Sequence, residues 1–157
     1  MPRRLPRLPP PMAEFDDEER EAVLAANRTF YRAFNERDYD AMEQIWAPSG
    51  AMVCLHPGQG PLHERADILR SWQGILGHPE APRVRCTDEW VVGRAGLAIV
   101  VCREILANGH LMATNTFVRL GTGWHIIGHH SGPVPAVERR PTAAAAVAPT
   151  TDRRKLH

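Results

Sequence analysis

The sequence lacks several features that mark common classes of protein. No segment approaches the roughly 20 consecutive apolar residues that a membrane-spanning helix needs. It has no glycine-rich phosphate-binding loop, no Cys-x-x-Cys pair and no Gly-x-Ser-x-Gly motif, so nucleotide binding, zinc binding and serine hydrolysis lack motif support. At the N-terminus, prolines rather than an apolar segment accompany the arginines. We therefore expect no secretory signal, no membrane partner and a cytoplasmic location.

Cysteine is also scarce. The chain of 157 residues contains only Cys54, Cys86 and Cys102, each within an apolar, strand-like run. An odd number of cysteines without framework spacing predicts reduced thiols that fill core volume rather than disulfides.

Charge is nearly balanced overall but uneven along the chain. The formal net charge is +1, whereas residues 1–12 and 138–157 together carry +6 and residues 13–137 carry −5. A dedicated nucleic-acid-binding domain is usually basic on one face. We therefore expect no nucleic-acid partner.

The two ends of the chain have compositions that disfavour a folded core. Residues 1–12 are dominated by proline and arginine, and residues 136–157 combine an alanine run with prolines and a basic end. Such segments cannot bury enough apolar surface to fold, so we predict disordered tails at 1–12 and 136–157. The remaining residues, 13–135, are long enough for one domain with its own core.

The first half of this domain predicts three helices and one strand. Residues 16–36 carry apolar side chains at helical spacing after an aspartate N-cap. A short helix bearing Trp46 follows, and a third helix covers residues 64–76. Between them, residues 51–56 form a predicted strand with Cys54 and His56 on one face.

The second half predicts four strands, at residues 83–92 and within the segment 97–131. Asn108-Gly109 is a strong two-residue hairpin signal, and residues 121–123 form a predicted three-residue turn. Strands joined in this way form an antiparallel sheet, and the preceding helices must cover one of its faces. We predict an α+β fold, in the order α-α-β-α-β-β-β-β, in which a curved sheet wraps the long first helix.

These turns also predict which side chains share a face of the sheet. Side chains alternate between the two faces of a strand, so counting outward from the two turns places eight of them on one face of the sheet. They are Val100, Cys102, Glu104, Ala113, Asn115, Phe117, Ile127 and His129. A single bulge in the last strand would exchange His129 for His130, and this alternative stays open.

Three polar side chains in this apolar face predict a small-molecule pocket. A histidine such as His129 beside Glu104 can act as a general base that the carboxylate orients, and Asn115 can donate to a developing oxyanion. His56 can point the same way from the end of the first strand. The alternative is a purely structural network, because buried polar groups are normally paired.

Two histidines and a carboxylate also suggest a metal site. However, no His-x-x-x-His or His-x-x-Glu pair lies on a predicted helix, and the ligands would come from separate strands. We therefore predict no metal and no cofactor. The four tryptophans, at positions 46, 72, 90 and 124, are expected to be core residues because each buries a large area.

Several segments, taken in order, resemble the SnoaL-like branch of the nuclear-transport-factor-like superfamily. They are FNERDYD at 34–40, IWA at 45–47, CLHPG at 54–58, SW at 71–72, ATNTF at 113–117 and HHSGP at 129–133 after Trp124. The resemblance covers about residues 17–135. The last segment is also similar to the association domain of calcium/calmodulin-dependent kinase. The resemblance implies a cone-shaped α+β barrel with an interior pocket, usually dimeric through the outer face of its sheet.

The catalytic residues of the ketosteroid isomerases in this superfamily do not carry over. Their first-helix tyrosine corresponds to Phe30, with Tyr31 adjacent, their catalytic aspartate falls near His56, and their oxyanion-hole acid falls at Asn115. His56 with Asn115 is closer in kind to a dehydratase or cyclase site.

We therefore expect a homodimer that binds a small apolar molecule. If it is an enzyme, it should act as an isomerase, cyclase or dehydratase, with His56 as base, Asn115 as oxyanion donor, and Glu104 with His129 as an orienting pair. The expected ligand contacts are Phe30, Trp46, Trp72, Cys102, Phe117 and His130. The alternative is a non-catalytic ligand-binding or association module.

Overall fold

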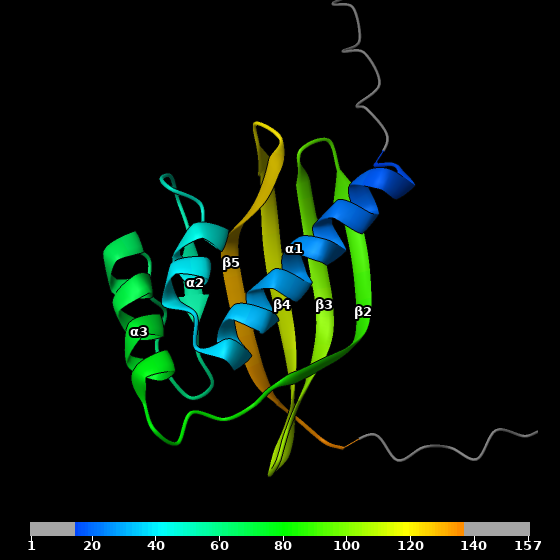
Figure 1. Ribbon diagram of the computed structural model, residues 1–157. Helices are drawn as coiled ribbons and strands as arrows, with labels where there is room; N and C mark the ends of the chain where they lie inside the picture. The colour runs from blue at the N-terminus through cyan, green and yellow to red at the C-terminus, as the bar shows by residue number, and fades with distance from the viewer. Residues whose placement is uncertain (1–14, 137–157) are drawn as a thin grey trace, which may run out of the picture.

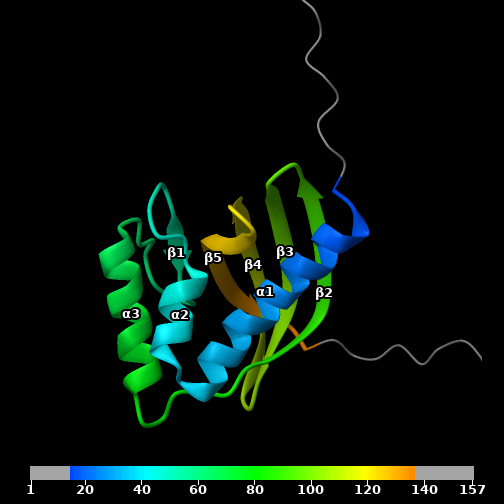
Figure 2. The ribbon, with the colours of Figure 1, turned by 45° about the horizontal axis from the view of Figure 1, so that its top comes forward.

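The computed structural model describes residues 15–136 as an α+β fold. Three helices lie on one side of a five-stranded sheet, and the first helix crosses that sheet obliquely (Figures 1 and 2). The elements follow the order α-α-β-α-β-β-β-β. The predicted fold class and element order are therefore confirmed.

Capping residues fix where the long first helix, α1 (Asp17–Glu36), begins and ends. The Asp16 side chain accepts a hydrogen bond from the Glu19 backbone N–H at 2.8 Å, which satisfies one of the free donors of the first turn. At the other end, Arg37 adopts a left-handed conformation with φ of 57°, the usual way for a helix to stop.

Three shorter elements follow α1 and complete the helical side of the fold. They are α2 (Tyr39–Ile45), which the Asp38 side chain caps, β1 (Val53–Leu55) and α3 (Arg65–Gly77). Contacts of α2 with α1 and α3 join the helices into one layer.

The remaining strands form three antiparallel pairs, and β1 adds a parallel edge. The strands are β2 (Arg85–Arg94), β3 (Leu97–Leu106), β4 (Gly109–Leu120) and β5 (Gly123–Val134), and the spatial order is β1-β5-β4-β3-β2. The parallel pairing places Cys54 beside His129. The end of β1 is thereby brought next to the polar part of β5, although the two are far apart in sequence.

The β3–β4 hairpin departs from the predicted register by two residues. Its turn is Ala107-Asn108, so Leu106 pairs with Gly109, and Cys102 pairs with Ala113 rather than with Asn115. Side chains alternate with a period of two, so a two-residue displacement leaves every side chain on its predicted face.

The β4–β5 hairpin contains two departures that cancel. Its turn is one residue shorter than predicted, so Phe117 pairs with Ile126 instead of Ile127. A bulge beside Thr116 and Phe117 then restores the register, and Asn115 pairs with His129. His129 therefore faces inward, which decides the alternative that the sequence left open.

The core lies between the helices and the inner face of the sheet. Its largest fully buried side chains include Trp46, Trp72, Phe30 and Phe117. Trp124 is also buried, but Trp90 is 70% exposed, so the expectation of four core tryptophans is wrong for Trp90. It lies on the outer face of β2, which no helix covers (Figure 1).

Some predictions concern parts of the chain beyond the described range. The predicted disordered tails lie outside the described residues, apart from residue 136. Within residues 15–136, no helix combines the length and apolar character needed to cross a bilayer.

Candidate functional site

A cavity of about 230 Å³ lies between the helices and the inner face of the sheet. Aromatic and aliphatic side chains form most of its wall, and polar groups enter from both layers. The lining residues that concern the chemistry are Phe30, Tyr31, His56, Trp72, Glu104, His129 and Ser131. An apolar cavity with a few convergent polar groups is the usual form of a small-molecule site.

Five of the residues predicted for the site line this cavity: Phe30, His56, Trp72, Glu104 and His129. Four others are fully buried in the structure without lining it: Trp46, Cys102, Asn115 and Phe117. His130 is exposed and lies on the opposite face of β5 from His129, so its predicted ligand contact is wrong. Alternation along a strand sends adjacent side chains to opposite faces.

Three rings stand close together in the cavity wall. The ring centroids of His56 and Trp72 are 4.7 Å apart, those of Trp72 and His129 are 5.6 Å apart, and the two imidazoles are 6.3 Å apart. The indole N–H of Trp72 is buried and has no hydrogen-bond partner among the described residues. This unpaired N–H lies in the packed interior, so Trp72 contributes its ring faces to the wall of the cavity.

A directed chain of hydrogen bonds runs from Glu89 on β2 to His129 on β5. The carboxylate of Glu89 accepts from the Asn27 side-chain NH₂ at 3.2 Å, so the Asn27 oxygen must point the other way. That oxygen accepts from the Asn115 NH₂ at 2.8 Å. The Asn115 oxygen then faces Nδ1 of His129 at 2.6 Å.

This chain assigns the tautomer of His129. Because the Asn115 oxygen can only accept, Nδ1 of His129 carries the proton and Nε2 keeps its lone pair. Burial, together with smaller contributions from the rings of His56 and His130, lowers the pKa of His129 to about 3. His129 is thus a neutral imidazole with a fixed acceptor.

These bonds correct two of the expected roles. Asn115 donates to both Asn27 and the Tyr31 hydroxyl, the latter at 3.3 Å. No donor remains for an oxyanion, so Asn115 is a positioning residue. The expected orienting pair of Glu104 and His129 is also wrong, because Asn115 orients the His129 ring.

His56 has the opposite tautomer. The Ser71 hydroxyl donates to the Ile68 carbonyl at 2.7 Å, so its oxygen accepts at 2.9 Å from Nε2–H of His56. Nδ1 of His56 therefore carries the lone pair and has no partner among the described residues. Burial lowers the pKa of His56, so this ring is also held neutral.

Glu104 is the acid of the cavity. Its two oxygens accept from the Tyr31 hydroxyl at 2.7 Å and from the Ser131 hydroxyl at 2.5 Å. Burial raises the pKa of Glu104, and the two hydrogen bonds offset part of that rise. A carboxyl group with a raised pKa takes up a proton more readily, and in its protonated form it can pass that proton to a substrate oxygen.

Sequence reasoning did not identify several members of this network: Asn27, Tyr31, Ser71 and Ser131. Two of them carried a recognisable pattern. Asn27 lies in the apolar stripe of α1, and Ser131 lies two residues after His129 on the same strand face. Ser71 had no such pattern, because its role depends on how α3 packs against β1.

The described residues contain no group of three or more His, Cys, Asp or Glu side chains that could hold a metal ion.

The fold and site together define a cone-shaped α+β protein with an interior pocket. Comparison with known proteins identifies its family. A sequence model of the SnoaL-like domain family matches residues 23–136. The chain belongs to this family, as its resemblance implied.

Two similar solved structures are above 25% identity. A candidate dehydratase of the NTF2-like family from Streptomyces avermitilis is 29% identical, with a TM-score of 0.70, covering 76% of this chain and 99% of that one. A candidate calcium/calmodulin-dependent protein kinase type II association domain from Thiobacillus denitrificans is 28% identical, with a TM-score of 0.65, covering 71% and 94%.

A curated relative comes from a plant. F-box protein SKIP8 of Arabidopsis thaliana is 24% identical in an alignment of 119 residues that covers 70% of this chain. The chain spans about half the length of that relative, 48%.

Proposed function

We propose that this protein is an acid–base enzyme that acts on a small, mainly apolar carbonyl compound, as a dehydratase, isomerase or cyclase. The observation that carries the proposal is a pair of neutral histidines in one aromatic cavity. Each has one ring nitrogen without a hydrogen-bond partner among the described residues, Nδ1 in His56 and Nε2 in His129. A neutral imidazole can take up a proton, which suits His56, whereas the low pKa of His129 leaves that ring as a hydrogen-bond acceptor.

The size and lining of the cavity favour a small substrate. Its volume of about 230 Å³ is below the roughly 300–1,000 Å³ of pockets for drug-sized ligands. Its walls are mostly apolar, with polar groups confined to a few positions. A compact ligand with one or two oxygen functions matches this arrangement.

Two polar groups of the cavity have a proposed role in the reaction. His56, through Nδ1, removes a proton from the carbon next to the carbonyl, because its ring is less buried than His129 and is the stronger base. Trp72 packs against this base, with 4.7 Å between the centroids of the two rings, and so holds the His56 ring in place. In a dehydration, Glu104 protonates the departing hydroxyl, so a C–H and a C–O bond break, a C=C bond forms, and water leaves.

The dehydratase variant of the proposal has specific support. The S. avermitilis structure is described as a candidate dehydratase, is 29% identical, and is covered almost completely by this chain. Dehydration also uses one base and one acid, which are the two kinds of group that the cavity offers.

The test is proton exchange at the carbon next to a carbonyl. The protein is incubated in D₂O with a panel of small aliphatic and aromatic ketones and β-hydroxy ketones, and NMR measures deuterium incorporation and loss of water. His56→Gln should lower the exchange rate by about 10²-fold or more. His63→Gln, an exposed histidine, is the control. No exchange with any ketone, or equal rates in His56→Gln, would overturn the catalytic proposal.

A second candidate is a non-catalytic ligand-binding or association module. It is supported by the 28% identical association domain and by exposed apolar side chains on the outer sheet face, with Trp90 at 70% and Val92 at 49%. Exposed apolar patches often mark interfaces. We propose that two copies of the chain pair through this face, with no nucleic-acid or membrane partner.

Native mass spectrometry of the purified protein tests this candidate directly. A dimer that retains a small molecule but shows no exchange would favour binding over catalysis. A monomer at micromolar concentration would contradict the association proposal.

A further inference from the structure

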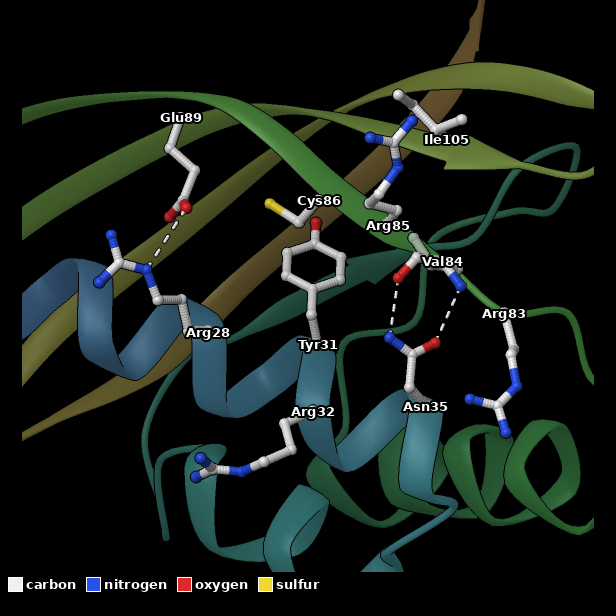
Figure 3. Close-up of a pocket in the computed structure, with 10 residues that line it drawn as sticks. All are labelled: Arg28, Tyr31, Arg32, Asn35, Arg83, Val84, Arg85, Cys86, Glu89 and Ile105. Atoms are coloured by element: carbon white, nitrogen blue, oxygen red, sulfur yellow. Dashed lines mark hydrogen bonds and ion pairs between the residues drawn. The ribbon is translucent and has the colours of Figure 1, made fainter.

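A second concave site lies on the other side of Tyr31 from the cavity, between α1 and the start of β2. It is a groove of about 570 Å³, and Figure 3 shows the residues that line it. Four of its ten lining residues are arginines: Arg28 and Arg32 from α1, and Arg83 and Arg85 from the segment that enters β2. Neither the family nor the proposed chemistry assigns a role to this arginine groove.

The arginine groove is positively charged within an acidic domain. Its only acid is Glu89, whose carboxylate lies 3.6 Å from Arg28. Arg32, Arg83 and Arg85 form no ion pair with any described residue. The groove therefore has a net charge of +3, whereas residues 13–137 as a whole carry −5.

The two segments that line the groove, α1 and the start of β2, are joined by hydrogen bonds between one side chain and the backbone. The Asn35 side chain donates to the Val84 carbonyl at 2.8 Å and accepts from the Val84 N–H at 2.9 Å. These two hydrogen bonds hold Val84, the residue between Arg83 and Arg85, against α1 (Figure 3). The arginine-bearing segments are thus preorganised, which lowers the entropic cost of binding a ligand.

The arrangement indicates the kind of ligand. Figure 3 shows the four guanidinium groups ranged around Tyr31 and Asn35 rather than converging on one point. A single small anion would meet one or two of them, whereas a ligand with several anionic groups would meet more. Guanidinium groups are suited to phosphate and carboxylate, which they can bind in a bidentate manner.

We propose that the arginine groove binds a small molecule with two or more phosphate or carboxylate groups. The rest of the folded domain carries net negative charge, which disfavours a long polyanion such as nucleic acid. Tyr31 and Val84 line both the groove and the inner cavity, so they form a wall between two separate sites.

Isothermal titration calorimetry of the full chain at constant ionic strength tests the proposal. Tripolyphosphate probes the phosphate form of the ligand, and citrate probes the carboxylate form. We expect saturable binding of at least one of them, with one site per chain. Arg83→Gln combined with Arg85→Gln should weaken that binding at least tenfold.

The matched control is Arg94→Gln, because Arg94 is exposed at the other end of β2 and does not line the groove. It should bind as the unaltered chain does. Thermal unfolding without ligand establishes that each variant is folded. The proposal is overturned if neither anion binds, or if the double variant and the Arg94 control lose affinity equally. Unchanged binding in a folded double variant also overturns it, because the anion would then lie elsewhere on the chain.

Discussion

Mild acid should destabilise this protein through the buried ring of His129. The side chain is 4% exposed, and burial lowers its pKa from 6.5 to about 3. The unfolded chain takes up a proton on this ring as the pH falls below 6.5, whereas the folded protein does not until about pH 3. Stability is therefore unaffected by this group above pH 6.5 and is lost progressively between pH 6.5 and 3.

The magnitude follows from that window. At about pH 7.5 the unfolded ring is mostly neutral, and at about pH 5, which is about 1.5 pH units below its pKa, it is mostly protonated. This proton uptake stabilises the unfolded chain by about 2 kcal/mol relative to the folded protein. Glu104 has the opposite sign: its raised pKa means that the folded state holds a proton that the unfolded state has lost, so acid favours folding through this group. The two effects are separated by changing only His129.

Urea unfolding at the two pH values measures the difference. His129→Gln removes the titrating ring and keeps a side-chain NH₂ that can donate to Asn115. The unaltered protein should lose about 2 kcal/mol more than this variant on acidification. His63→Gln, which alters an exposed ring, should retain the full loss. Equal losses in the unaltered protein and in His129→Gln would refute the assignment of a neutral, buried His129.

Four further substitutions test the packing and the outer face. Asn115→Leu should cost at least about 2 kcal/mol in urea unfolding, because several buried partners lose their hydrogen bonds; a cost below about 0.5 kcal/mol would show that the network is dispensable. Gly128→Ala should cost about 1 kcal/mol, since the added methyl group would lie 3.3 Å from Thr116, whereas Gly132→Ala, which meets open space, should be nearly neutral. Trp90→Ser should convert the proposed dimer to monomer in sedimentation velocity without lowering monomer stability; a persistent dimer would place the interface elsewhere.

The order of helices and strands was predictable because its causes are local. An aspartate can cap a helix from its own position, apolar residues at helical spacing define one side of α1, and Asn108-Gly109 favours a tight turn. Most of the inner face of the sheet was predictable for the same reason, since alternation survives a register displacement of two residues. In β5, however, the buried Ile126 takes the place that was predicted for Ile127. The inward direction of His129 depends on a bulge that compensates for the shorter β4–β5 turn. No local sequence pattern predicted that bulge.

The sequence by itself determined which side chains could meet, through helix periodicity, strand alternation and tight turns. Only the tertiary structure decided which of them bond. Asn115 was predicted on the inner face, but its role as a positioning residue depends on Asn27, 88 positions away. The free nitrogen of His56 depends on Ser71 of α3. Likewise, the arginine groove exists because Asn35 clamps the segment at Val84 against α1. Hydrogen bonds between distant segments depend on how layers pack, and short-range patterns do not encode that packing.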